Sequence, residues 1–426
     1  MKTISKTAVA IAAGMLFSMG SAQAADLGGN CCADLEERVA ELEATTARKG
    51  NRKVSLTISG QVNRLIMSFD SSFAPAGGLA KNTYWGLDNT NTSSRFNLTG
   101  RAKIDGTRNA GFNMTIEVGS GGRSVAVSQA RAEAPTVTGH VGTGDLNDHS
   151  IMMRDANVWL EDTRLGRVTL GRLTQSGPQG TIDLGGIGVI APGTVLVGNG
   201  LLFATGFSIG AGFDQAADYN KRIDGIRYES PTWQGFQLAA SYGEASKVAP
   251  FTAGQEDLGN AYAVNLRYAN EFNGVRVAAA IGYERLDQDS IVTGAHRNNE
   301  KEIFGLSGSL MHVPTGLFVQ TGWSKVETDL AREGTYWHIA AGVTRNWFGI
   351  GNTSLYGEYG IGKDMFFVHE VAGSALGQDM KFWGLGVVQN IDAAAMELYA
   401  SYRNFSTNIA TQDDIGLFTA GARIRF

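Results

Sequence analysis

Apolar and polar positions alternate with a period of two from residue 54 to the end of this chain. In 95–104, for example, Phe96, Leu98, Ala102 and Ile104 share one face, and basic, amide or hydroxyl side chains share the other. Successive residues of a β-strand point to opposite faces, so the pattern predicts strands. The two sheets of a soluble sandwich share one core, which would not accept the charges of the polar face. A barrel with an apolar outside and a wet inside accommodates both faces, and we predict a transmembrane β-barrel.

Stretches of this kind recur sixteen times. They cover about 54–67, 93–105, 110–119, 150–161, 165–173, 221–230, 234–243, 260–270, 273–285, 301–312, 316–327, 334–346, 351–360, 380–390, 393–404 and 415–426. Bacterial barrels have an even number of antiparallel strands, and sixteen strands enclose an aqueous lumen. The fold class expected is therefore all-β, a 16-stranded antiparallel transmembrane β-barrel.

The connections between these stretches alternate in length. Short ones carry turn residues, as at Asp105-Gly106. Long ones are expected near 68–92, 120–149, 174–220, 244–259, 286–300 and 361–379, with briefer ones near 328–333 and 405–414. Short periplasmic turns opposite longer external loops are typical of outer-membrane barrels. Aromatic residues near the strand ends fit interfacial girdles: Tyr228, Trp233, Phe236, Phe272, Trp323, Trp347, Phe348 and Tyr402.

The N-terminal 52 residues follow different patterns. Two lysines, an apolar run over 8–20 and the small-x-small sequence Ala22-Gln23-Ala24 predict a signal peptide over 1–24. Residues 25–52 form a periplasmic segment in this interpretation, and 53–426 form the barrel. Within 33–49, Leu35, Val39 and Leu42 have the spacing of a short coiled-coil helix, which needs a partner to persist. A frayed surface helix is the alternative.

Composition excludes several classes of protein. The mean hydropathy of −0.10 is too low for a helical membrane protein. The 56 glycines do not recur at every third position, which excludes collagen. A net charge of −5 gives no basic signature for nucleic acid. Cys31 and Cys32 are the only cysteines, and export would expose them to an oxidising compartment. They could pair with each other, cross-link subunits or have no role.

The sequence carries no constellation for catalysis. It has six histidines, none of them spaced as metal ligands, and no Gly-x-Ser-x-Gly nucleophile elbow. We therefore expect a protein that is not an enzyme and that uses no cofactor or metal.

Three segments resemble the general porins of alphaproteobacteria, which are trimeric 16-stranded diffusion channels. They are 34–63, the hairpin RIDGIRYESPTWQGFQLAASYGE at 222–244 and the terminal GARIRF at 421–426. The resemblance implies a bacterial outer-membrane homotrimer whose water-filled pore passes small hydrophilic solutes and ions. It also implies contact with outer-membrane lipid and lipopolysaccharide, and insertion by the barrel assembly machinery with Phe426 as the assembly signal.

The resemblance further implies that the third external loop, 174–220, folds into the lumen and forms a constriction. Barrel-wall arginines would face acidic loop residues there and create a transverse field. The matching wall positions are Arg95, Arg101, Arg154 and Arg172, and the loop positions are Asp183, Asp214 and Asp218. Arg154 is out of phase with Val158 and Leu160, so it reaches the lumen only if the strand has a bulge.

Two other classes remain open. A substrate-specific channel would bind a sugar or an anion, and Trp159 has the phase of a lumen residue. A structural or adhesive barrel would have a narrower or plugged lumen.

Overall fold

The computed structural model describes residues 53–71, 81–89, 92–118, 151–190, 222–245, 259–292, 295–328, 332–364, 379–408 and 414–426. Several predictions concern residues outside these ranges and remain untested by the structure: the signal peptide, the helix at 33–49, the state of the two cysteines, and the loop positions of Asp214 and Asp218.

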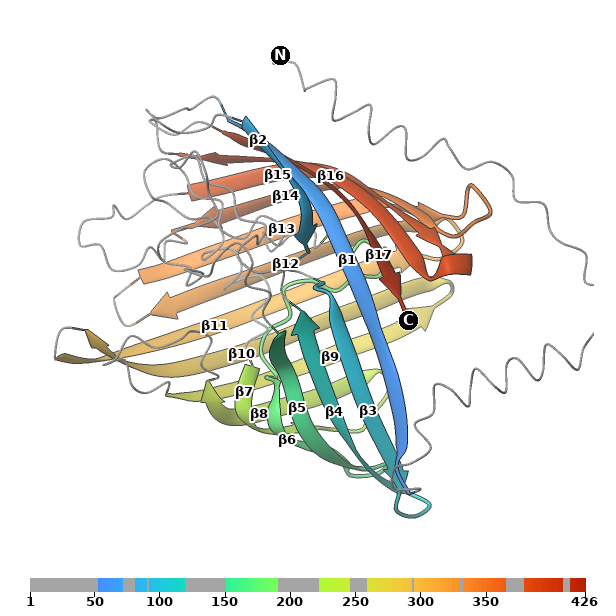
Figure 1. Cartoon of the computed structure of the whole chain (residues 1–426). Helices are drawn as coiled ribbons and strands as arrows, with labels where there is room; N and C mark the ends of the chain where they lie inside the picture. The colour runs from blue at the N-terminus through green and yellow to red at the C-terminus, as the bar shows by residue number, and fades with distance from the viewer. Residues whose placement is uncertain are drawn as a thin grey trace, which may run out of the picture.

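The described residues form one antiparallel sheet that closes on itself, because β1 pairs with β17 (Figure 1). Its strand segments are β1 (Ser55–Ser71), β2 (Lys81–Asp88), β3 (Arg95–Lys103), β4 (Arg108–Val118), β5 (Ile151–Asp162), β6 (Gly166–Thr174), β7 (Arg222–Glu229), β8 (Phe236–Ala245), β9 (Asn260–Phe272), β10 (Val275–Val292), β11 (Ala295–His312), β12 (Leu317–Thr328), β13 (Arg332–Arg345), β14 (Thr353–Lys363), β15 (Asp379–Ile391), β16 (Met396–Thr407) and β17 (Ile415–Arg425). A single 3-10 turn, η1 (Asp392–Ala394), joins β15 to β16. No helix in the described ranges is long and apolar enough to cross a membrane.

The segments β2 and β3 together occupy one position in the barrel. The first half of β1 pairs with β3, from Ser55 opposite Arg101, and its second half pairs with β2, up to Asp70 opposite Lys81. The barrel thus has sixteen strand positions, as predicted from the alternation. The expectation of a loop throughout 68–92 is wrong, since 81–88 is a strand. Its sequence, KNTYWGLD, does not alternate, and the β1–β2 register shifts near Leu65, so the pattern of two faces is lost there.

The expected loop at 286–300 is also wrong, because β10 and β11 continue as a hairpin to Val292 and Ala295. Arg285 joins the two strands there. Its guanidinium lies 2.9 Å from the Asp287 carboxylate, 2.7 Å from Glu300 and 3.2 Å from Glu302. A strand with water on both sides needs no apolar face, so the alternation that predicts strands disappears in such a hairpin.

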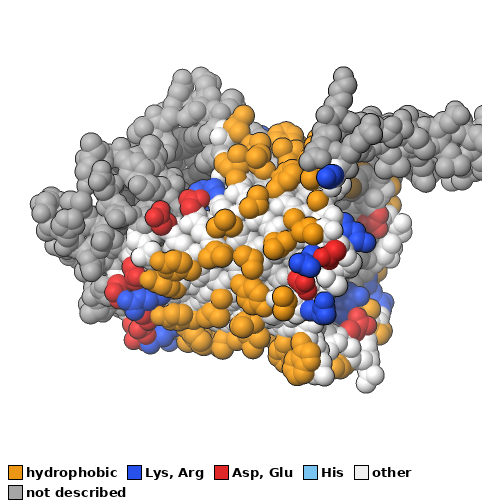
Figure 2. Space-filling model, turned by 90° about the horizontal axis from the view of Figure 1, so that it is seen from below, with side chains coloured by type: hydrophobic (Ala, Val, Ile, Leu, Met, Phe, Trp, Pro, Cys, Tyr) orange, Lys and Arg blue, Asp and Glu red, His pale blue; other side chains and the backbone are white. Residues whose placement is uncertain are grey.

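The outer face of the barrel is apolar. Large exposed side chains such as Leu266 on β9, Leu306 on β11 and Leu385 on β15 point outward. Figure 2 shows hydrophobic side chains across the middle of one face and charged side chains gathered towards its two ends. Six of the predicted girdle aromatics are well exposed, which fits the membrane interface: Tyr228, Trp233, Phe236, Phe272, Trp347 and Phe348.

Several strand glycines are covered by aromatic rings of the same chain. A Cβ on Gly60 would lie 2.5 Å from the Phe426 ring, and one on Gly100 would overlap the Phe112 ring. Such rings cover the backbone that a glycine leaves bare in a sheet. Phe426 also exchanges main-chain hydrogen bonds of 2.8 and 3.1 Å with Gly60. The C-terminal residue therefore packs on the outer face at the seam between β1 and β17.

Candidate functional site

The segment 175–190, which follows β6, lies against the inner wall of the barrel. At its start the Ser176 N–H donates to Ser241 Oγ on β8 (2.8 Å), and Asn265 on β9 donates to the Gly177 carbonyl (3.1 Å). At its end Arg403 on β16 donates to the Ile190 carbonyl (3.2 Å). The described part of the third loop thus runs along the wall from β8 to β16, and the predicted inward fold is confirmed for this part.

A row of wall glycines makes room for the segment. Gly282, Gly305 and Gly322 sit on the neighbouring strands β10, β11 and β12, with their Cα atoms facing the lumen. A Cβ on Gly282 would lie 2.7 Å from the Pro178 Cα, and one on Gly305 would lie 2.9 Å from the Pro178 Cβ. A Cβ on Gly322 would overlap the Gly180 carbonyl oxygen. Backbone packs on backbone here, which is a reason for glycine inside a strand.

Hydrogen bonds and a buried ion pair hold the second half of the segment. The Gly185 carbonyl accepts hydrogen bonds from Thr344 Oγ1 (2.6 Å) and Ser354 Oγ (2.8 Å). Beyond it, Arg403 Nε lies 2.7 Å from Glu358 Oε1, with 2% and 1% of the two side chains exposed. Two charges so far from water stabilise their site only as a pair, so the end of the segment depends on both partners.

Arg95 faces the lumen without a close counter-charge. The register sets it opposite Gln61 and Glu117, on the face away from the exposed Phe96. Its guanidinium makes no hydrogen bond and has no carboxylate within 4.0 Å in the described part of the chain. Its electrostatic neighbours are Arg154, Arg423, Glu117 and Asp155. The wall at this level therefore carries an excess of positive charge.

The bulge that Arg154 requires is present. The β4–β5 register shifts between Thr115, which pairs with Asp155, and Ile116, which pairs with Met153. Arg154 is the additional residue, and its guanidinium lies 2.7 Å from the Glu117 carboxylate. The bulge thus brings Arg154 to the lumen side beside Arg95. Arg222 and Arg423 also lie near this group and were missed from the sequence.

Arg172 does not face the lumen, according to the register of its strand. It shares its face with Leu170, which is 57% exposed on the apolar outside, and it lies 3.7 Å from Asp224 across the β6–β7 pair. Arg172 was predicted to lie on the lumen wall because it stands near the end of its strand, as the corresponding arginine does in the porins that the sequence resembles. The period of two puts it on the other face from Gly171 and Leu173.

Arg101 faces the lumen but at another level. It lies six residues beyond Arg95 on β3, roughly 20 Å at about 3.3 Å per residue, and 3.7 Å from Glu161. It belongs to a second group with Arg167, Arg227 and Arg267, none of which was predicted from the sequence. Arg227 lies between the outward-facing Ile226 and Tyr228, and Arg267 lies between Leu266 and Tyr268. Arg167 precedes Val168, which is exposed on the outer face with Leu170. The phase of each strand could therefore have found all three arginines.

Asp183 is exposed within the described part of the loop. Its carboxylate accepts hydrogen bonds from the Ile187 N–H (3.2 Å) and the Gly188 N–H (2.6 Å). Asp183 therefore stabilises a turn of the segment while its charge stays in contact with water. Asp214 and Asp218 are not among the described residues.

A closed barrel with an apolar outside, a charged inside and a loop folded along its inner wall defines the class of outer-membrane channels. Residues 7–410 match the family described as Gram-negative porin, so the chain belongs to this family. The protein is a passive channel of the Gram-negative outer membrane.

Solved structures of similar fold include other porins. The anion-selective porin from Comamonas acidovorans has 17% identity and a TM-score of 0.54, with 88% of this chain and 100% of that chain covered. OmpF of Salmonella typhi, in complex with daunomycin, has 13% identity and a TM-score of 0.51, covering 88% and 98%. The trimer form of Vibrio cholerae OmpT has 12% identity and a TM-score of 0.50, covering 88% and 99%. These identities show likeness of fold. No curated protein matches the sequence.

Proposed function

We propose that this porin is a general diffusion channel for small hydrophilic solutes and ions, narrowed by the 175–190 segment. The observation that carries the proposal is the path of this segment along the inner wall from β8 to β16. A loop that lies inside the barrel takes up part of the lumen cross-section. The remaining passage then selects solutes by size and charge.

We further propose that the constriction prefers anions. Arg95 and Arg154 supply fixed positive charge on the wall, and only Arg154 has a carboxylate within 4.0 Å in the described residues. The whole chain has a net charge of −5, so the positive field near Arg95 arises from the local arrangement of these arginines and not from the overall charge. Such a field concentrates small anions and repels cations, and salt screens it over about 10 Å at 0.1 M.

Replacement of Arg95 by Gln tests the role of the wall. The Arg95→Gln channel should shift its reversal potential in a KCl gradient towards that of a cation-preferring pore, since one uncompensated charge is lost. The control is Arg276→Gln, which removes the same charge from the lumen face near a short turn, where Arg276 lies 3.0 Å from Glu271. An unchanged reversal potential in Arg95→Gln, or an equal shift in both variants, would contradict the proposal that Arg95 sets the ion selectivity of the constriction.

The finer assignments are also proposals. The trimer form of the structurally similar OmpT supports a homotrimer. The segments at 34–63 and 222–244 support membership of the alphaproteobacterial branch. The main-chain bonds of Phe426 to Gly60 at the barrel seam fit a role of this residue in barrel assembly. Chemical cross-linking of intact cells, read as the mass of the largest folded species, tests the trimer.

A further inference from the structure

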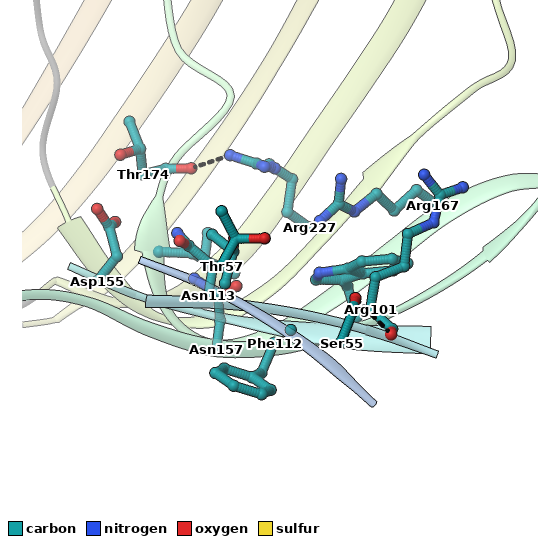
Figure 3. A pocket seen from close by; sticks show the side chains of 14 residues that line it. Ser55, Thr57, Arg101, Phe112, Asn113, Asp155, Asn157, Arg167, Thr174 and Arg227 are labelled. Carbon is teal, nitrogen blue, oxygen red and sulfur yellow. Dashed lines mark hydrogen bonds between the residues drawn. The ribbon is translucent and has the colours of Figure 1, made fainter. Parts of the chain in front are cut away.

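A pocket of about 470 Å³ lies in the lumen wall around Arg101, on the short-turn side of Arg95. Its lining comes from β1 and β3 to β7, and the pocket also reaches Asp155. In Figure 3 the side chains of Arg227, Arg167 and Arg101 gather towards one end and Asp155 lies at the other, while the Phe112 ring turns away. The volume falls in the range of small-molecule sites, roughly 300–1,000 Å³.

The arginine end of the pocket carries more positive than negative charge. Arg167 makes no hydrogen bond and no ion pair within 4.0 Å in the described ranges, and the same holds for the adjacent Arg267. Arg227 donates to the Thr174 carbonyl (2.9 Å) and lies 3.2 Å from Glu229. Among the described residues, Glu161 and Glu229 are the carboxylates that act on these four guanidinium groups, Arg101 included. The group can therefore accept an additional anion.

The Arg167 guanidinium is held in place by an aromatic ring. Its central carbon lies 4.2 Å from the centroid of the Trp159 ring, in the geometry of a cation–π contact. This contact fixes the plane of the guanidinium and leaves its N–H donors without a protein acceptor. A planar fork of this kind fits the two oxygens of a carboxylate or phosphate group.

Uncharged polar groups line the rest of the pocket. Thr57, Thr99 and Asn113 come from β1, β3 and β4, and their side chains contribute hydroxyl and amide groups. In the described part of the chain the hydroxyls of Thr57 and Thr99 and the amide of the Asn113 side chain have no hydrogen-bond partner. Groups of this type recognise the hydroxyls of a solute.

We infer that this pocket is a subsite for small hydroxylated organic anions, in which Arg167 and its neighbours hold a carboxylate or phosphate group. The threonines and Asn113 bind the hydroxyls of the same solute. The inference rests on the proposed function, since it assigns one class of solute to the lumen of the open channel. Binding there is weak and reversible, because a site inside a channel must release what it takes up.

The test is a titration of the channel in a planar bilayer at low KCl with sodium gluconate, glucose 6-phosphate or glucose. The two anions should reduce the current saturably, and glucose, which offers hydroxyls alone, should not. Arg167→Gln should weaken the effect about tenfold, the size expected for one charge-assisted hydrogen bond, and Arg167→Lys should restore part of it. Arg276→Gln is the control for loss of a lumen charge outside the pocket. A heat-dependent shift in gel mobility verifies that each variant is folded.

Equal block by glucose and gluconate, or a block that Arg167→Gln leaves unchanged, would overturn the subsite. Block by gluconate alone assigns the site to carboxylates, and block by glucose 6-phosphate alone assigns it to phosphates. Calorimetry of the folded protein in detergent measures gluconate binding without conductance. Binding in a protein that does not conduct would support the subsite and overturn the diffusion channel. Conductance with no binding of either anion would overturn the subsite alone.

Discussion

Gly282 on β10 offers a direct test of how the 175–190 segment is seated. In a Gly282→Ala variant the added Cβ would lie 2.7 Å from the Pro178 Cα and 2.8 Å from the Pro178 nitrogen. Carbon atoms pack at about 3.5–4.0 Å, so the backbone of the segment must move by roughly 1 Å. β10 is held by β9 on one side and β11 on the other, and the movement therefore falls on the segment.

The cost of this clash can be compared with the bonds that hold the segment. Overpacking by one methyl group costs about 1–3 kcal/mol. A hydrogen bond contributes about 0.5–1.5 kcal/mol, and those to Gly177 and Gly185 flank the site of the clash. The free-energy cost of the clash is similar to the contribution of one or two such hydrogen bonds. We therefore expect Pro178 to move away from the wall while the ends of the segment stay attached. The segment then projects further into the lumen.

The assay is single-channel conductance in symmetric KCl. Gly282→Ala should conduct less than the parent protein, and its folded barrel should still show a heat-dependent mobility shift. The control is Gly308→Ala on the outer face of the adjacent β11, which makes the same substitution in a strand where a Cβ would have its nearest neighbour at 3.8 Å. Parent-like conductance of Gly282→Ala, or the same loss in Gly308→Ala, would refute the seating of the segment against β10.

Three further changes test other parts of the structure. Glu358→Gln leaves the buried Arg403 without its carboxylate and should destabilise the barrel by about 3–5 kcal/mol, measured by urea unfolding in detergent; parent-like stability would contradict the role of the pair. Asp105 in the β3–β4 turn accepts hydrogen bonds from the backbone of Thr107 and Arg108, which lower its pKa below 3.8. Its stabilisation is therefore complete at neutral pH and is lost as the pH falls below 3.8 through the lowered pKa, so the difference in thermal midpoint between the parent and Asp105→Asn should vanish in acid. Deletion of Phe426 removes its contacts with Gly60 and should lower the yield of folded protein in the outer membrane at equal synthesis, read by the ratio of heat-shifted to unshifted bands.

The strands could be predicted because the membrane imposes a simple rule on them. One face meets lipid and the other meets water, so sixteen stretches of alternating residues mark sixteen strand positions. The rule fails where lipid is absent from one side. The hairpin beyond Arg285 alternates poorly for this reason, and so does 81–88, which continues the barrel past a break between β2 and β3. Local sequence gives no other signal for these strands.

The candidate site was predictable only in part. The phase of β3 places Arg95 and Arg101 in the lumen, and the same argument applied to β6, β7 and β9 would have found Arg167, Arg227 and Arg267. The seating of the loop was not predictable. Its contacts join residues far apart in the chain, from 65 positions for Ser176 and Ser241 to 213 for Ile190 and Arg403, and no local pattern records which wall residue a loop will meet.

We propose that this chain forms an open, water-filled channel whose wall favours anions. Single-channel recording of the purified protein in a planar bilayer under a KCl gradient tests it most directly. We expect large ohmic steps that close in thirds, as in a trimer, and a reversal potential with the sign of a chloride-preferring pore. Folded barrels that give no conductance would contradict the proposal of an open channel. A reversal potential with the sign of a potassium-preferring pore would contradict the proposal that basic residues set the selectivity of the constriction.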